Sequence, residues 1–376
     1  MRIGFDAKKI ARNFTGIGNY SRSLVNALTS FQPDVECHLM VPCAENPKAI
    51  SRLTNIERLH FHHPAAPYFG PLRELWRCRT VASDIKALQI DLYHGLSNEI
   101  PFGINRVCKS VVTIHDLIFL RHPEIYGAMA RRILRAKTRY ACENAHRIIA
   151  ISEQTKRDII DFYHIDPQKI TVVYQGCDEI FAQKVSESQI AEVMRHHNLP
   201  SDYILSVGTF EPRKNQISLI KALPHCPNAH LVLAGKPTPY LDTLRQCAQS
   251  LGVAERVHFI SNVPQEHLPA LYQGCKVFAY LSYFEGFGIP VLEAATSGAP
   301  ILAATGSCLQ EAGGEGQAYC EPFDVEQIAH EISDILSNPD RQQAMRQSAL
   351  AHARNFTAPQ IAKNMKAVYE EVLNEQ

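Results

Sequence analysis

Two positively charged side chains stand next to each other in the second half of the sequence. Arg213 and Lys214 follow the apolar run Tyr203–Val207, in a loop that begins at Gly208. An arginine can bind two phosphate oxygens at once, and a neighbouring lysine adds a point charge. Open α/β sheets bind ligands at the carboxyl ends of their strands. The pair is therefore a candidate site for a diphosphate, and the alternative is a solvated pair on a loop.

Two carboxylates with seven residues between them follow a later apolar run. Glu285 lies near the start of this segment and Glu293 lies at its end. Gly286 and Gly288, on either side of Phe287, predict a tight loop. Both carboxylates are then expected at the mouth of the sheet. Because two anions would repel a diphosphate that they touched, they are better suited to accept hydrogen bonds from sugar hydroxyls.

A helix is expected to begin close to Pro290, because proline suits the first turn of a helix. This start places Glu293 in the first helical turn and Glu285 on the loop. A carboxylate in a first turn also stabilises its own helix, by a few tenths of a kcal/mol up to about 1 kcal/mol. This alternative accounts for Glu293 but leaves Glu285 unexplained.

The first half of the chain carries a glycine turn and a histidine at the ends of expected strands. Gly16 and Gly18 follow the apolar run Met1–Phe5 and precede a helix predicted from Asn19. Such a turn lets the backbone approach a phosphate, although turns of this kind also form where the backbone needs a positive φ. His115 follows the run Ser110–Ile114 and is either a site residue or a hydrogen-bonded core histidine.

Short β-like runs alternate with helix-like stretches along the whole chain, which indicates parallel sheets covered on both faces. The first series of runs is Met1–Phe5, Cys37–Val41, Leu92–His94, Ser110–Ile114, Arg147–Ile151 and Ile170–Tyr174. The second series is Tyr203–Val207, Leu231–Ala234, Val257–Ile260, Val277–Leu281, Pro300–Ala303 and Ala318–Cys320. The polar segment Ala182–Pro200 between the two series is expected to connect two Rossmann-like α/β domains.

The composition excludes several classes of protein. Lys plus Arg and Asp plus Glu are both 38, so the formal net charge is zero, which argues against a nucleic-acid partner. The longest apolar stretches fall far short of the ~20 residues of a membrane-spanning helix. Charged residues interrupt the N-terminal apolar segment, so no signal peptide is expected. These features predict a cytoplasmic protein, at most attached to a membrane surface.

The cysteines and histidines do not predict a metal site. The chain has 11 cysteines, and no two of them have the Cys-x-x-Cys spacing of a structural zinc site. His60, His62 and His63 form a local cluster without a cysteine or carboxylate at a ligand spacing. The chain also lacks an Asp-x-Asp pair to hold a divalent ion on a diphosphate. Arg213 and Lys214 can supply the compensating charge, so no obligate metal and no cofactor is expected.

The motifs resemble those of retaining glycosyltransferases of family 4, which have the GT-B fold. Gly208–Asn215 and the Glu-x7-Glu segment Glu285–Glu293 resemble the donor-site signatures of this family. Tyr174–Asp178 resembles the segment that closes the N-terminal domain, and Val112–Asp116 resembles a strand that ends in an active-site histidine. The resemblance covers nearly the whole chain.

The resemblance implies two Rossmann-like domains whose parallel sheets face each other across a cleft. Residues 1–182 would form the acceptor-binding domain, and residues 200–356 would bind the nucleotide sugar. The last segment, residues 357–376, would be a helix that crosses back to the N-terminal domain. Its apolar residues recur at helical spacing after Thr357, a plausible N-cap.

The resemblance also implies a role for each candidate in the second half of the chain. Arg213 and Lys214 would hold the diphosphate. Glu293 would bind the ribose hydroxyls, and Glu285 would contact the transferred sugar. The remaining donor-loop residues are Gly208, Gly286, Phe287 and Gly288.

In the first half, Gly16 and Gly18 would close over the donor. His115 would contact the sugar or organise the reaction centre.

The expected reaction is hexose transfer with retention, from a nucleotide sugar to a saccharide or lipid-linked saccharide acceptor in surface polysaccharide synthesis. Overall resemblance to bacterial mannosyltransferases favours GDP-mannose, and a UDP-sugar stays an alternative. The other functions considered are a nucleotide-sugar epimerase of the same architecture and a non-catalytic sugar-nucleotide binding protein.

A basic stripe and an aromatic loop suggest where an acceptor or membrane would bind. Arg131, Arg135 and Arg139 recur on one face of a predicted helix, where they either meet anionic lipid or acceptor diphosphate, or are simply solvated. The segment Pro67–Leu72, with Trp76 after it, either dips into a membrane interface or packs on its own domain.

Overall fold

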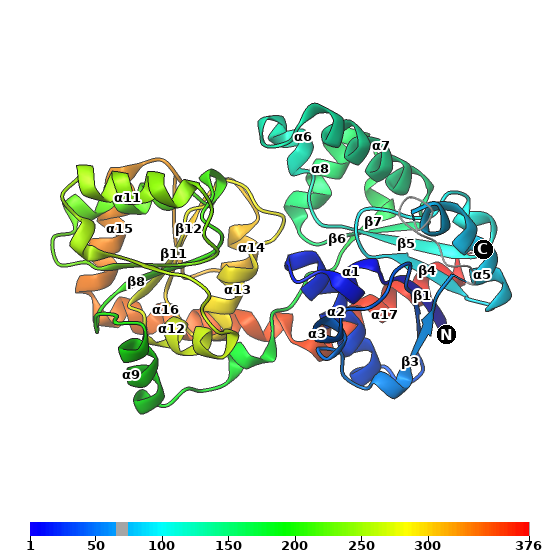
Figure 1. Cartoon of the computed structure of the whole chain (residues 1–376), viewed down its shortest axis with the longest axis horizontal. Helices are drawn as coiled ribbons and strands as arrows, with labels where there is room; N and C mark the ends of the chain where they lie inside the picture. The colour runs from blue at the N-terminus through cyan, green and yellow to red at the C-terminus, as the bar shows by residue number, and fades with distance from the viewer. Residues whose placement is uncertain (65–73, 376) are drawn as a thin grey trace. The chain divides into compact units, whose positions relative to one another are not determined.

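The computed structural model describes residues 1–64 and 74–375. The chain folds into two compact units. One unit comprises Met1–Gly176 and Phe356–Gln376, and the other comprises Cys177–Asn355. Figure 1 shows in each unit a twisted sheet with helices packed against it.

The described residues of the first unit form a seven-stranded parallel sheet, in the order β3-β2-β1-β4-β5-β6-β7. Its strands are β1 Arg2–Asp6, β2 Glu36–Met40, β3 Leu59–His62, β4 Leu92–Gly95, β5 Lys109–Ile114, β6 Arg147–Ala150 and β7 Ile170–Val172. Its helices are α1 Lys8–Arg12, α2 Gly16–Phe31, α3 Pro47–Ile50, α5 Val81–Ala87, α6 Ile118–Arg121, α7 Ala128–Asn144, α8 Glu153–Tyr163 and α17 Ala358–Asn374.

Two apolar layers cover this sheet, because its central strands bury side chains on both faces. One layer packs α2 and α17 on the sheet, with Leu24, Leu28 and Met365 among its members. The other layer contains Ile85 of α5 and Ile159 of α8. The C-terminal helix α17 therefore belongs to the first unit.

The second unit has a six-stranded parallel sheet, in the order β10-β9-β8-β11-β12-β13. Its strands are β8 Ile204–Val207, β9 Leu231–Ala234, β10 Val257–Ile260, β11 Val277–Tyr280, β12 Ile301–Ala304 and β13 Ala318–Cys320. Its helices are α9 Glu187–His196, α10 Gln216–Ala222, α11 Tyr240–Ser250, α12 Leu268–Gly274, α13 Ile289–Thr296, α14 Leu309–Gly313, α15 Val325–Ser337 and α16 Pro339–Ala353. Helices α10, α11 and α15 contribute to one continuous apolar core with the sheet.

The prediction of two parallel α/β sheets is confirmed, and each predicted strand is present within a residue or two. The structure adds β3, whose sequence Leu-His-Phe-His lacks a continuous apolar run. It also differs over the segment Ala182–Pro200, which was expected to be a connection. Most of that segment forms α9, which packs on α12 within the second unit.

The order of the strands determines where ligands can bind. In the second unit β8 and β11 are neighbours, so the chain leaves their carboxyl ends toward opposite sides of the sheet. In the first unit β1 and β4 are neighbours in the same way. Such topological switch points open a crevice at the strand ends, and ligands of open α/β sheets bind there.

None of the helices in residues 1–64 and 74–375 combines the length and the apolar character that a membrane crossing needs.

Candidate functional site

The loops that follow β8 and β11 lie together at the switch point of the second unit. Arg213 and Lys214 form a short 3₁₀ turn with Pro212 after β8. The carbonyl oxygen of Arg213 accepts hydrogen bonds from the hydroxyl of Ser282 at 3.1 Å and from the amide of Tyr283 at 3.2 Å. These bonds hold the loop after β8 against the loop after β11.

The two cations share one carboxylate. The guanidinium of Arg213 lies 2.9 Å from Oε1 of Glu285, and the ammonium of Lys214 lies 2.5 Å from the same oxygen. The hydroxyl of Tyr280 accepts from Lys214 at 2.7 Å and donates to Glu285 at 3.0 Å. Arg213, Lys214, Tyr280 and Glu285 are named here the strand-end cluster.

Burial strengthens the electrostatics of the strand-end cluster. Between 12% and 17% of the side-chain surface of Arg213, Lys214 and Glu285 is exposed. Burial alone would raise the pKa of Glu285, but the charges of Lys214 and Arg213 outweigh it and lower this pKa to about 2. For Arg213, burial opposes the charged form, yet Glu285 and Glu211 raise its pKa above the ordinary value. Glu285 is therefore ionised throughout the physiological pH range.

Arg213 keeps further partners that fix its orientation. It donates to the carbonyl oxygen of Phe284 at 2.6 Å and to the carboxylate of Glu211 at 2.7 Å. An anion that enters the cluster would replace carboxylate oxygens as the acceptor of hydrogen bonds from the same donors. The arrangement can therefore bind a diphosphate and offer an ionised carboxylate to the hydroxyls of an attached group.

Glu293 has a different environment from the one predicted. It is the fifth residue of α13, beyond the first helical turn, in which no acidic residue lies. The hydroxyl of Tyr272 donates to it at 2.9 Å. Burial raises the pKa of Glu293 to about 7, against the lowering effect of this hydrogen bond. The ion pairs among the described residues do not include Glu293, so three of the four predicted charged residues converge.

The predicted donor-loop residues differ in their local structure. The amide of Gly208 donates to the carbonyl oxygen of Ala234 at 2.9 Å, at the end of the neighbouring strand β9. Gly288 is the N-cap of α13 with φ of 100°, and an added Cβ would lie 2.6 Å from Leu309. The ring of Phe287 is buried, with 1% exposure, so its backbone is the part of this residue that the loop can offer to a donor. Gly286 lies between Glu285 and Phe287 on the same loop.

In the first unit, the two predicted glycines open helix α2. Gly16 is the first residue of α2, is exposed, and has open space where a Cβ would be. Gly18 is buried, and a Cβ there would lie 2.1 Å from the carbonyl oxygen of Asn13. The side chain of Asn13 accepts from the amides of Thr15 at 2.8 Å and Gly18 at 3.2 Å. Gly18 is therefore required by the turn itself, whereas Gly16 leaves backbone accessible.

His115 follows β5 and is buried, with 6% exposure. Its Nε2 lies 2.8 Å from the carbonyl oxygen of Leu96, to which it can only donate, so Nδ1 carries the free lone pair of the neutral ring. The rings of Tyr20 and His115 form a T-shaped pair, with 4.8 Å between their centroids. Burial lowers the pKa of His115 to about 4, so the ring is neutral near pH 7. Tyr20 lies on the first turns of α2, so the glycine turn and His115 are neighbours.

A buried hydrogen-bond network behind His115 was not predicted. The hydroxyl groups of Tyr20 and Thr113 lie 3.0 Å apart. Nε2 of His94 lies 2.8 Å from Thr113 Oγ1, and its Nδ1 lies 2.7 Å from the hydroxyl of Tyr369 on α17. The network thus connects the C-terminal helix to the residue that packs on His115.

The site residues that were not predicted from the sequence are mostly tyrosines, whose hydroxyl groups or rings contact the predicted residues. Tyr280 completes the strand-end cluster, Tyr272 binds Glu293, and Tyr20 supports His115. Tyr280 could have been found, because it is the last residue of a strand whose loop was already a candidate. Tyr272 lies on α12, well before Glu293 in the sequence, and no local pattern connects them.

The features proposed for membrane or acceptor binding also have defined positions. Trp76 is buried, and its indole donates to Asp84 at 2.8 Å, so it packs on its own domain. The segment Pro67–Leu72 lies outside the described residues. On α7, Arg139 pairs with Glu143 at 2.7 Å, while the apolar Met129 is 70% exposed.

The chain thus has two parallel α/β units, and the cations and carboxylate at the switch point of one of them suit an anionic, hydroxyl-bearing ligand. Family models identify the class more closely. Residues 14–180 match the model for "Glycosyltransferase Family 4", and residues 187–352 match the model for "Glycosyl transferases group 1". The chain belongs to these glycosyltransferases and is an enzyme of that class, which confirms the resemblance in its motifs.

Curated relatives share much of the sequence. The chain is 27% identical over 371 residues to the O-antigen chain mannosyltransferase B of Escherichia coli. The alignment covers 95% of this chain and 96% of that protein. It is 30% identical over 289 residues to the serotype-specific mannosyltransferase WbdA of Escherichia coli. That alignment covers 74% of this chain but 35% of WbdA.

Solved structures share the fold. The Anabaena protein HepE, in complex with UDP and glucose, superposes with a TM-score of 0.75 at 20% identity, over 99% of this chain and 100% of HepE. WaaG, a glycosyltransferase involved in lipopolysaccharide biosynthesis, superposes with a TM-score of 0.71 at 15% identity, over 98% of this chain and 99% of WaaG. The chain therefore has the predicted GT-B fold.

Proposed function

We propose that this glycosyltransferase transfers mannose, with retention of anomeric configuration, from GDP-mannose to a saccharide or lipid-linked saccharide acceptor in surface polysaccharide synthesis. The O-antigen mannosyltransferase B supports this assignment, because it matches the chain over nearly its whole length. The neighbour that binds UDP and glucose keeps a UDP-sugar as the alternative donor.

The strand-end cluster is the observation that carries the proposal. Arg213 and Lys214 meet at one carboxylate oxygen, so a diphosphate can accept from both cations at once. Each charge-assisted hydrogen bond contributes about 1.5–3 kcal/mol. The charge that a metal would otherwise supply is present in the side chains, so we propose that the reaction needs neither a metal nor another cofactor.

The proposed chemistry separates charge at the anomeric carbon. As the bond to the diphosphate breaks, positive charge develops on the sugar and negative charge on the leaving group. Arg213 and Lys214 stabilise the departing diphosphate, an effect that is large in a partly buried site. Glu285 has a pKa of about 2 and cannot act as a general acid near pH 7. Its ionised carboxylate is suited to accept hydrogen bonds from sugar hydroxyls and to stabilise the positive charge that develops on the sugar.

Retention is proposed to follow a front-face route. The acceptor hydroxyl attacks from the side that the diphosphate leaves, and the departing phosphate oxygen takes its proton. Glu293, whose pKa is about 7, is proposed to bind the ribose hydroxyls. In the first unit the accessible amide of Gly16 is proposed to meet the donor, and the neutral His115 to orient the sugar. A trapped covalent glycosyl-enzyme would contradict this route.

The acceptor is proposed to be reached at the inner face of the cytoplasmic membrane, through helix α7. Arg132, Arg135, Met129 and Ile133 are exposed on this helix. Cations beside apolar side chains suit a surface of anionic lipid. We expect binding to vesicles that contain phosphatidylglycerol, weakened by salt and by the double substitution Arg132→Glu and Arg135→Glu.

The control for this membrane experiment is a second double variant of equal charge. Lys86→Glu with Arg106→Glu changes two exposed cations of the same unit that lie outside α7. Equal vesicle binding by both double variants, or no binding at low salt, would refute the membrane contact.

Donor identity is tested by calorimetry with GDP, UDP and ADP, followed by turnover of GDP-mannose and UDP-glucose. A synthetic mannose-terminated saccharide serves as acceptor, and NMR gives the configuration of the product. We expect GDP to bind most tightly. We also expect Arg213→Ala and Lys214→Ala each to weaken that binding by between about 10-fold and 100-fold.

Lys221→Ala, an exposed cation on α10, is the control and should leave nucleotide binding unchanged. Unchanged affinity in both cluster variants would show that the donor site is misplaced. Epimerised donor without transfer would indicate the epimerase, and binding without any turnover would indicate a non-catalytic protein.

A further inference from the structure

Three histidines gather on the second unit, outside the strand-end cluster. His196 ends helix α9, His197 caps it, and His267 ends the 3₁₀ turn Gln265–His267 that leads into α12. One ring nitrogen of each histidine lies within 4.8 Å of the others. Two separate segments of the chain, about 70 residues apart, bring these rings together.

The rings meet with a geometry that a metal ion could use. Nε2 of His197 lies 3.1 Å from Nδ1 of His267. Two imidazoles bound to one zinc ion in tetrahedral geometry hold their nitrogens about 3.3 Å apart, since each Zn–N bond is about 2.0–2.1 Å. The third ring, His196, is exposed and can approach by rotation of its side chain. Its plane makes angles of 86° with His197 and 79° with His267.

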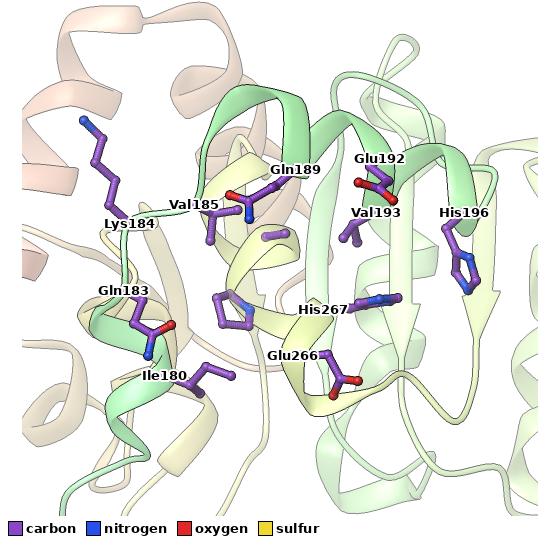
Figure 2. A pocket seen from close by; sticks show the side chains of 12 residues that line it. Ile180, Gln183, Lys184, Val185, Gln189, Glu192, Val193, His196, Glu266 and His267 are labelled. Atoms are coloured by element: carbon purple, nitrogen blue, oxygen red, sulfur yellow. The ribbon is translucent and has the colours of Figure 1, made fainter.

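The surroundings favour a cation. His196 and His267 line one end of a pocket of about 370 Å³, together with the carboxylates Glu192 and Glu266. In Figure 2 the ring of His267 extends toward the side of α9 that carries Glu192 and His196, while Lys184 extends away from them. The carboxyl end of α9 adds the partial negative charge of the helix dipole.

We propose that His196, His197 and His267 form an accessory site for a divalent transition-metal ion of the zinc class. Imidazole ligands select zinc, nickel or copper over magnesium and calcium. The three rings supply three ligands, and water or a pocket carboxylate completes the fourth position. The bound ion fastens α9 to the start of α12, and it takes no part in the proposed sugar transfer.

Metal binding requires a tautomer change but no change in charge. Without metal, His197 and His267 share one proton between the nitrogens that lie 3.1 Å apart. When both nitrogens bind the ion, that proton moves to the outer nitrogen of the ring that carries it. Burial and the neighbouring histidines lower the pKa of His197, so its ring is already in the neutral form that binds metal.

A second histidine cluster provides an internal comparison. Glu36, His38 and His60 also bring ligand atoms within 4.8 Å of one another. There, however, Arg2 lies 3.3 Å from the carboxylate of Glu36 and competes with a metal for it. A positive side chain beside the carboxylate also repels the ion, so this second cluster is the poorer site.

The test is a calorimetric titration of the full-length protein with zinc chloride, and with magnesium chloride for comparison. We expect saturable zinc binding and no magnesium binding. His196→Gln and His267→Gln should each weaken zinc binding by more than about 10-fold, because each removes one ligand. Cobalt should give the absorption spectrum of a tetrahedral site in the unaltered protein, and that spectrum should be lost in both variants.

His60→Gln is the matched control, since it removes a histidine from the other cluster and should leave the tight zinc binding intact. His196 is exposed, so His196→Gln should keep the unfolding temperature that the protein shows in EDTA. The proposal is overturned if the unaltered protein does not bind zinc saturably. It is also overturned if His196→Gln binds zinc as tightly as the unaltered protein, or if His60→Gln alone abolishes binding.

Discussion

Replacing Glu285 by glutamine should make the free protein less stable and its nucleotide binding tighter. The variant removes the carboxylate that Arg213 and Lys214 share at 2.9 Å and 2.5 Å. These contacts lower its pKa from 4.5 to about 2, and each pKa unit corresponds to about 1.36 kcal/mol. The cations therefore favour the ionised carboxylate by roughly 3 kcal/mol.

The same number predicts both results. At pH 7 the free energy of unfolding of Glu285→Gln should fall by up to roughly 3 kcal/mol, because two partly buried cations lose a partner. Since the pKa of Glu285 is lowered in the folded state, this contribution is present above pH 4.5 and is lost as the pH falls through about 2. The variant and the unaltered protein should therefore differ in stability above pH 4.5 and converge as the pH falls from 4.5 to about 2.

A diphosphate no longer competes with Glu285 in the variant, so GDP should bind roughly 10-fold more tightly. A 10-fold change in affinity corresponds to about 1.4 kcal/mol, or about half of the roughly 3 kcal/mol by which the cations favour the carboxylate. Turnover should nevertheless fall, because the sugar loses the ionised carboxylate. Urea unfolding and GDP calorimetry give the two values, and Glu315→Gln, an exposed carboxylate of the same unit, is the control. If Glu285→Gln shows unchanged stability and weaker GDP binding, the carboxylate does not compete with the diphosphate and the reasoning is wrong.

Three further substitutions test individual features of the structure. Because the pKa of Glu293 is raised to about 7, its stabilising contribution is present below pH 4.5 and is lost as the pH rises through 7. Glu293→Gln should therefore raise the unfolding temperature at pH 8 and leave it unchanged at pH 4.5. Gly16→Ala should leave the unfolding temperature unchanged, whereas Gly18→Ala should lower it by several degrees through the clash with Asn13; equal effects would contradict the structure of the turn. Tyr369→Phe should reduce the free energy of unfolding in urea by about 1–3 kcal/mol, because it leaves a buried ring nitrogen unpaired, and no change would show that water replaces the hydroxyl.

Much of the fold could be predicted because its strands are buried on both faces and therefore appear as short, continuous apolar runs. Strand β3 was missed because it is an edge strand in which two polar residues alternate with apolar ones, so it has no continuous apolar run. The connection between the two series was predicted from its polar composition, and α9 forms there because a capping box at Ser186 supports an exposed helix.

The strand-end cluster was predictable for a simple topological reason. Residues that follow parallel strands lie at one edge of a sheet, so Arg213, Lys214 and Glu285 had to be near one another if β8 and β11 were neighbours. The places of Glu293 and Phe287 were not predictable in this way. A shift of one or two residues in the start of a helix changes the side to which each of its residues points. The direction of these side chains therefore depends on the exact residue at which α13 begins.

Three features follow from the amino-acid sequence alone: two parallel α/β sheets form, glycine loops follow their central strands, and cations and a carboxylate lie at one edge of a sheet. Apolar periodicity and loop composition are local, so they can be read along the chain. Other features are visible only in the folded chain: Arg213 and Lys214 share one oxygen of Glu285, Tyr369 hydrogen-bonds His94, and two distant segments bring three histidines together. These contacts join residues far apart in the sequence, and their distances depend on how whole helices pack.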